Sequence, residues 1–174
     1  MANKQINELT EITSIEETDL LVVYDVDEGG SEKTKKILKS NFLGYEESSS
    51  ILTVSDSQSG GNETSTATAY YTKVGNSITI SCVFNNINTT GLTSGATLYI
   101  TGLPYTSSNN VRFLGSVRTS DITFNGQIVV ETVENTDVVR FINAKGDGST
   151  ATILVNQLTD DSTDIRFTLT YFTS

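Results

Sequence analysis

The sequence predicts an all-β protein in which an antiparallel, jelly-roll-like β-sandwich over residues 51–174 follows a small β-hairpin. Two observations predict this class. Apolar and polar side chains alternate with a period of two in several short segments, and turn-forming residues separate those segments at short intervals. The residues after position 50 show no helical spacing of apolar side chains, so about eight or nine strands in two packed sheets are expected.

The N-terminal hairpin is predicted from two short segments on either side of a turn. Residues 20–26 form a continuous apolar run of strand length, which needs cover on both faces. After a turn at 27–31, residues 33–38 return as a second strand, and Phe42 and Leu43 follow in a brief turn. A two-stranded ribbon of this size is marginal alone, so we expect it to dock on another protein.

The boundary between the two parts is placed at a polar stretch. Residues 46–50 read Glu-Glu-Ser-Ser-Ser, a composition typical of a flexible linker. The predicted division is therefore an N-terminal segment over residues 1–47, a linker over residues 48–50 and a β domain over residues 51–174.

The clearest hairpin of the β domain is centred on a Gly-Asn pair at positions 75–76. Glycine at the first central position suits a type II′ turn, which places Tyr71 opposite Ile80 and Tyr70 opposite Ser81. One face of this hairpin is apolar and belongs to the core. The other face is rich in threonine and is interpreted as sheet and subunit packing.

The remaining strands are predicted from the same alternation. The last one is the clearest, with Ile165, Phe167, Leu169 and Tyr171 on one face. A second hairpin, with an Asn-Gly turn of type I′ at positions 125–126, is predicted within residues 122–132. The other predicted strands are residues 51–54, 97–101, 111–117, 138–142 and 151–155.

Composition excludes several classes of function. The chain has 21 acidic and 11 basic residues, and its net charge of −10 disfavours nucleic acid and anionic membranes as partners. Histidine is absent, which excludes Ser-His and Cys-His catalytic pairs, and the lone Cys82 is interpreted as a small buried hydrophobe. The sequence shows neither a signal-peptide pattern nor a bilayer-spanning apolar run, so synthesis in the cytoplasm without membrane insertion is expected.

Acidic side chains in loops are the candidates for catalysis or ion binding. Paired carboxylates cleave glycans, and residues 160–164 also offer oxygen ligands for calcium, although they lack the spacing and the glycine of an EF-hand loop. Solvated loop acids are the favoured interpretation, so no catalytic, metal or cofactor site is expected. The acids considered are Glu131, Glu134, Asp147, Asp160, Asp161 and Asp164.

One loop carries the candidates for recognition. Tyr105 is followed by Ser107, Asn109 and Asn110, a combination typical of the rim of a sugar-binding site. The favoured alternative is that Tyr105 fills a core end or a subunit seam. Four arginines lie at polar strand positions, where they suit either solvent or pairing between subunits with acids such as Glu131. They are Arg112, Arg118, Arg140 and Arg166.

Two stretches resemble parts of bacteriophage fibre proteins. Tyr-Tyr-Thr-Lys-Val-Gly-Asn-Ser-Ile-Thr-Ile-Ser at 70–81, followed by Leu-Tyr-Ile-Thr-Gly-Leu-Pro-Tyr at 98–105, resembles a β domain at the C-terminal end of many short tailed-phage fibres. Asp-Leu-Leu-Val-Val-Tyr-Asp at 19–25, with Thr-Lys-Lys-Ile at 34–37 and Asn-Phe-Leu at 41–43, resembles an N-terminal segment of virion appendage proteins. The resemblance implies attachment to the particle through the first part and a trimeric jelly-roll head in the second.

Together these observations predict a non-enzymatic virion structural protein, a short trimeric fibre or spike whose head adheres to host-surface glycan. The expected partners are further copies of itself, capsid or tail proteins, and a glycan. Three alternatives stay open, which are a capsid decoration or cement protein, a glycan-degrading tailspike-type enzyme and a free-standing carbohydrate-binding module. The predicted anchoring residues are Leu20, Leu21, Val22, Val23, Tyr24, Ile37, Phe42 and Leu43, and the predicted receptor-contact residues are Tyr105, Ser107, Asn109 and Asn110.

Overall fold

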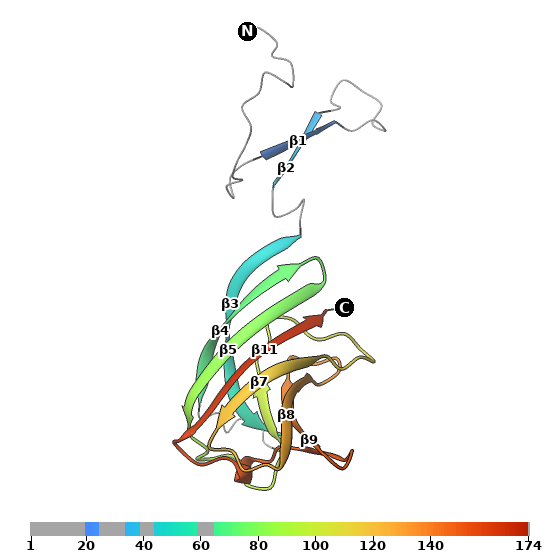
Figure 1. Cartoon of the computed structure of the whole chain (residues 1–174). Coiled ribbons are helices and arrows are strands. Elements are labelled where there is room, and N and C mark those ends of the chain that lie inside the picture. Colours follow the sequence, from blue (N-terminus) through green and yellow to red (C-terminus); the bar gives the residue numbers. More distant parts are fainter. Residues whose placement is uncertain (1–19, 25–33, 39–43, 59–64, 174) are drawn as a thin grey trace. The chain divides into compact units, whose positions relative to one another are not determined.

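The computed structural model describes residues 20–24, 34–38, 44–58 and 65–173 and divides the chain into two compact units, Met1–Tyr45 and Glu46–Ser174. Among the described residues all regular structure is β apart from one short 3-10 helix, η2 (Val155–Gln157), which confirms the predicted all-β class (Figure 1). Within those same ranges, no helix has the length and hydrophobicity that crossing a membrane requires.

The first unit contains one antiparallel pair of strands, β1 (Leu20–Tyr24) and β2 (Thr34–Leu38). Their register places Leu20 opposite Leu38 and Tyr24 opposite Thr34. The two strands predicted for the N-terminal segment are therefore confirmed.

The second unit is a closed antiparallel barrel rather than the predicted sandwich. Eight strands follow one another around it in the order β9-β6-β3-β4-β5-β11-β7-β8, and β8 then pairs with β9 to close the circle. A ninth strand, β10, lies on the other side of β9. The strands are β3 (Tyr45–Asp56), β4 (Thr66–Val74), β5 (Ser77–Ile87), β6 (Leu98–Thr101), β7 (Leu114–Ser120), β8 (Gly126–Thr132), β9 (Val139–Lys145), β10 (Thr150–Thr152) and β11 (Thr163–Phe172).

The predicted linker is wrong. Residues 48–50 lie inside β3, which begins at Tyr45 and takes its place in the barrel wall between β6 and β4. Serine is a poor guide here because Ser48 and Ser49 lie on opposite faces of β3 and are both exposed, and an exposed stretch of strand accepts serine on either face. The boundary between the two units lies before this strand, at residues 45–46.

The barrel interior holds the hydrophobic core, and the two strands read most clearly from the sequence line it as predicted. Alternate side chains of β5 and β11 are buried, among them Ile80, Cys82, Phe167 and Tyr171. Tyr71 lies opposite Ile80, and the φ angle is positive at Gly75 but not at Asn76, as a type II′ turn requires. Side chains facing inward from every strand fill a barrel of this size.

The second predicted hairpin does not form. A type I′ turn needs positive φ at both central residues, and neither Asn125 nor Gly126 has it. Instead, Asn125 accepts a hydrogen bond from Nδ2 of Asn143, and Gly126 begins β8, whose partner is β9 along its whole length. A Cβ at Gly126 would lie 2.2 Å from the carbonyl oxygen of Ala144, so glycine here serves close strand contact rather than a turn.

Candidate functional site

The loop predicted to contact a receptor is partly built into the barrel. Tyr105 is half-buried, and its hydroxyl donates a hydrogen bond of 2.6 Å to Oε2 of Glu46. Ser107 is fully buried and donates from Oγ to the carbonyl of Val133. Of the four predicted residues, only Asn109 and Asn110 are exposed to solvent.

Glu46 lies at the centre of a polar cluster that ties β3 to β4 and to the loop after β6. Its second carboxylate oxygen accepts a hydrogen bond from the Tyr71 hydroxyl, and the Tyr71 and Tyr105 rings meet edge to face. Nζ of Lys73 lies 5.1 Å from the centre of the Tyr105 ring. The hydrogen bond from Tyr105, followed by that from Tyr71, holds the pKa of Glu46 below its ordinary value, and the same bonds raise the pKa of both tyrosines.

This cluster predicts a loss of stability at acid pH. The folded-state pKa of Glu46 is lower than its ordinary value of 4.5, so its contribution is fully present above pH 4.5 and disappears as the pH falls through the folded-state pKa. Glu46→Gln is expected to lower the free energy of unfolding at neutral pH and to weaken its dependence on acid. Urea unfolding of full-length protein at neutral pH and below pH 4.5 measures both effects.

The matched control for that measurement is Glu47→Gln, which alters the next residue, an exposed glutamate. We expect the control to keep the acid dependence of the unaltered protein. Equal acid sensitivity of the Glu46→Gln variant and the unaltered protein would contradict the role given to the cluster.

The predicted anchoring residues fall in the first unit. Leu20 to Tyr24 make up β1, and Ile37 lies opposite Leu21 on β2. Phe42 and Leu43 lie outside the described residues. The structure thus brings six of the eight onto one strand pair, and their role in attachment stays a prediction.

The predicted aspartates at positions 160, 161 and 164 accept hydrogen bonds from residues 86–89 of the same chain. Asp160 accepts hydrogen bonds from the backbone and hydroxyl of Thr89, while Asp161 and Asp164 accept one each from residues 86–88. Asp160 therefore has a lowered pKa, caused first by the backbone donor. Over the ranges that the structure describes, no group of three or more metal-ligating side chains is placed to hold an ion.

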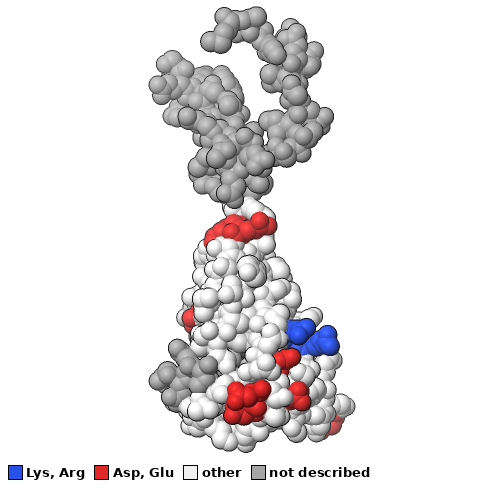
Figure 2. All heavy atoms as spheres, turned by 90° about the vertical axis from the view of Figure 1, so that its left-hand side faces the viewer, with Lys and Arg blue, Asp and Glu red and all other residues white. Residues whose placement is uncertain are grey.

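The outer faces of four neighbouring strands form a wall of mostly uncharged side chains, on which Arg118, Asp164 and Arg166 are the charged members. This outer wall is made of the outward side chains of β4, β5, β11 and β7, and hydroxyl pairs link its strands, Thr79 with Thr170 at 2.9 Å and Ser81 with Thr168 at 3.0 Å. Figure 2, which faces the strands on the left of Figure 1, shows a broad uncharged area between acidic groups at its two ends, with basic side chains at the right-hand edge of the view. The members of the outer wall are Thr68, Tyr70, Thr72, Val74, Ser77, Thr79, Ser81, Val83, Leu114, Ser116, Arg118, Ser120, Asp164, Arg166, Thr168, Thr170 and Phe172.

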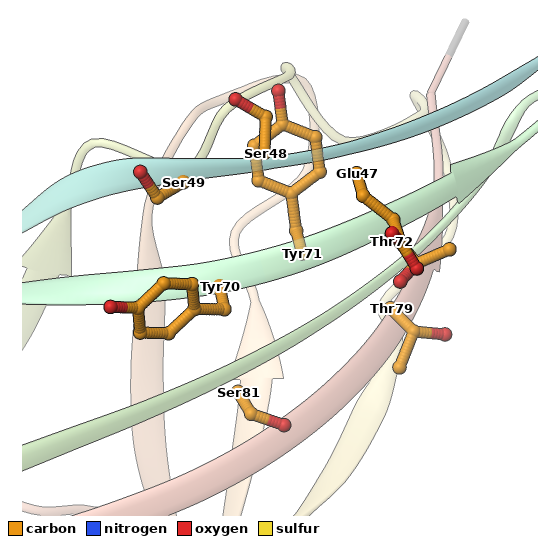
Figure 3. A pocket seen from close by; sticks show the side chains of 8 residues that line it. All are labelled: Glu47, Ser48, Ser49, Tyr70, Tyr71, Thr72, Thr79 and Ser81. Carbon is orange, nitrogen blue, oxygen red and sulfur yellow. The ribbon is translucent and has the colours of Figure 1, made fainter. Parts of the chain in front are cut away.

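Two open grooves cross the outer wall on either side of Tyr70. Groove one, of about 560 Å³, lies over β3, β4 and β5 (Figure 3), and groove two, of about 530 Å³, lies over β4, β5, β11 and β7. Tyr70 and Ser81 line both grooves, and 71% of the Tyr70 residue surface is exposed. An exposed tyrosine with hydroxyl groups on both sides presents a flat apolar ring and many hydrogen-bonding partners to one ligand.

Groove two also holds two arginines that face each other across the β11–β7 pair. Arg166 lies directly opposite Arg118 in the register of these strands. Within the described part of the chain, neither guanidinium forms an ion pair. Arg140 on β9 and Arg112, just before β7, differ, because both form ion pairs with Glu131 of the same chain.

No family model, curated protein or solved structure matches the chain. Sequence reasoning found the strand that carries Tyr70 but interpreted its outer face as packing. It did not pair Arg118 with Arg166, because those residues lie far apart in the chain and meet only through the β11–β7 register.

Proposed function

We propose that the chain is a non-enzymatic structural protein of a bacteriophage virion, a short trimeric fibre or spike. Its N-terminal segment attaches to other proteins of the capsid or tail, and its barrel adheres to a glycan on the host surface. The resemblance of residues 19–43 and 70–105 to fibre proteins supports the virion part of this proposal. The division into two units supports a separate attachment segment and head.

The observation that carries the adhesive part is the exposed ring of Tyr70 between two hydroxyl-lined grooves. Sugars present apolar ring faces and many hydroxyl groups, so they bind best where an aromatic ring and short polar side chains lie together. The outer wall offers this combination over four strands, with Thr79 and Ser81 beside Tyr70. Rigid strands hold these side chains in place, as adhesion to a repeated surface polymer requires.

Two measurements on the full-length protein test this proposal. Native mass is expected at three times the chain mass of 18.8 kDa. On an array of purified bacterial surface polysaccharides, we expect binding to a subset of them, weakened about tenfold or more by Tyr70→Ala. Thr152→Ala, on β10 and outside the outer wall, is the control for the substitution.

Other outcomes separate the alternatives. A monomer that binds no polysaccharide but associates with phage capsids would replace the proposal with the decoration or cement function. Shortening of a bound polysaccharide during incubation would replace it with the tailspike-type enzyme.

A further inference from the structure

We propose that groove two binds an acidic glycan, in which a carboxylate, sulfate or phosphate group lies between Arg118 and Arg166 while a neighbouring sugar ring rests on Tyr70. This inference rests on the proposed adhesive function and names the chemical class of its ligand. It would place the anion on β11 and β7 and the sugar ring on β4, within a single groove.

The first step is the arrangement of the two arginines. Like charges directly opposite each other on antiparallel strands destabilise a sheet, and no acid among the described residues forms an ion pair with either of them. The nearest acid on the same face of β11 is Asp164, two residues before Arg166, and its Oδ1 accepts a hydrogen bond from the backbone of Asn86. Two arginines at opposite register positions in one groove, without an ion pair among the described residues, favour binding of an oxyanion, because each guanidinium can donate to it bidentately.

The second step is the position of these arginines relative to Tyr70. Two rows of outward side chains cross the sheet, one with Tyr70, Ser81 and Thr168 and the next with Val83, Arg166 and Arg118. Since neighbouring strands lie about 4.8 Å apart, β4 and β11 are separated by about 10 Å across the sheet. A ligand that covers both therefore extends beyond one charged group, as a sugar chain does and a free inorganic ion does not.

The third step is the lining between the two ends of groove two. Ser81 and Thr168 share one hydrogen bond, in which one hydroxyl donates to the other, so the accepting hydroxyl keeps its hydrogen for a ligand. Thr68 and Ser116 add two further hydroxyls to the lining. Sugar hydroxyls find both donors and acceptors along such a floor.

A second copy of this chain is the competing occupant, because its acidic loops carry charge opposite to that of the arginines. The composition of groove two favours the glycan. Cores of protein interfaces are depleted in serine. The lining of groove two instead combines four hydroxyl side chains and two guanidinium groups with Tyr70 and four apolar side chains, Cys82, Val83, Val117 and Phe167. Association between copies through these arginines is therefore an outcome that the test must exclude.

The test uses the full-length protein and two probes that differ in charge, dextran sulfate and unmodified dextran, beside the polysaccharide array. We expect dextran sulfate to bind more tightly than dextran and acidic members of the array to bind more tightly than neutral ones. Arg118→Gln and Arg166→Gln are each expected to weaken binding of the acidic probes about tenfold. Lys145→Gln removes the same charge from a residue outside groove two and is expected to leave binding unchanged.

Each contrary result has its own meaning. Equal binding of acidic and neutral polysaccharides, unaffected by the arginine variants, would overturn this inference and leave the adhesive function standing. Absence of binding to every polysaccharide would overturn the adhesive function as well. A fall in native mass with Arg118→Gln or Arg166→Gln would assign the pair to contacts between copies and would also overturn the inference, while thermal unfolding of each variant verifies that it is folded.

Discussion

Replacing Gly102 with alanine is expected to lower the free energy of unfolding by about 2 to 4 kcal/mol. Gly102 follows β6 in the Gly-Leu-Pro stretch, with φ at +94°, where a side chain is strained. A Cβ at this position would lie 2.5 Å from the backbone oxygen of Ile51 on β3, and a backbone atom inside a barrel wall has little room to move. Backbone strain at position 102 and the collision of the Cβ with the Ile51 oxygen therefore both lower the stability of this variant.

The backbone around Gly102 explains why the site cannot easily relax. Ser50 donates a hydrogen bond of 2.8 Å to the carbonyl of Gly102, and the next residue, Leu103, is buried in the core and donates from its backbone to Asp137. Denaturant unfolding of the full-length protein measures the effect. Gly146→Ala is the control, since a Cβ there meets nothing within 4 Å, and its expected change is within about 0.5 kcal/mol.

An unfolding midpoint for Gly102→Ala equal to that of the Gly146→Ala control would contradict this explanation. The result also bears on the sequence pattern itself. Glycine at position 102 is required by one close contact between β3 and the end of β6, so the Gly-Leu-Pro stretch has a structural reason that is independent of any family resemblance.

Elements whose partner is near in the chain were predicted well. The β4–β5 register follows from the Gly-Asn turn at positions 75–76, which lies between the two strands, and the alternation of β11 is visible along a single strand. Both signals are local, so a period of two and one turn are enough to place the side chains on the correct faces.

Features that depend on distant partners were not predicted. Apolar and polar side chains alternate along a strand in the same way in a sandwich and in a barrel. The pattern indicates which face of the strand is buried, but it does not indicate which strand lies beside it. Closure depends on β11 pairing with both β5 and β7 and on β6 pairing with both β3 and β9, and these partners lie far apart in the chain. The candidate site has the same character, since Arg118 meets Arg166 only across β7 and β11.

Replacing Arg140 with methionine is expected to lower the free energy of unfolding by about 2 to 4 kcal/mol. Glu131 is only 8% exposed, and Arg140, directly opposite on β9, donates to its Oε1 through both Nε and a terminal nitrogen. Without Arg140, the Glu131 carboxylate still has an ion pair with Arg112, whose nearest nitrogen lies 3.8 Å from Oε1. The cost arises because a buried charge loses its main partner, and denaturant unfolding of the full-length protein measures it.

Two further variants show whether pairing is the cause. Adding Glu131→Leu to Arg140→Met removes the buried charge as well and is expected to restore at least half of the lost stability; no recovery would mean that Arg140 acts through packing alone.

Arg118→Met provides the contrast, because Arg118 has no ion pair among the described residues and faces Arg166 across the strands. It is expected to leave stability unchanged or slightly raised, as relief of like-charge repulsion predicts. If Arg118 can be removed at no cost to the fold, its charge stays available for the ligand proposed for groove two, whereas Arg140 serves the barrel.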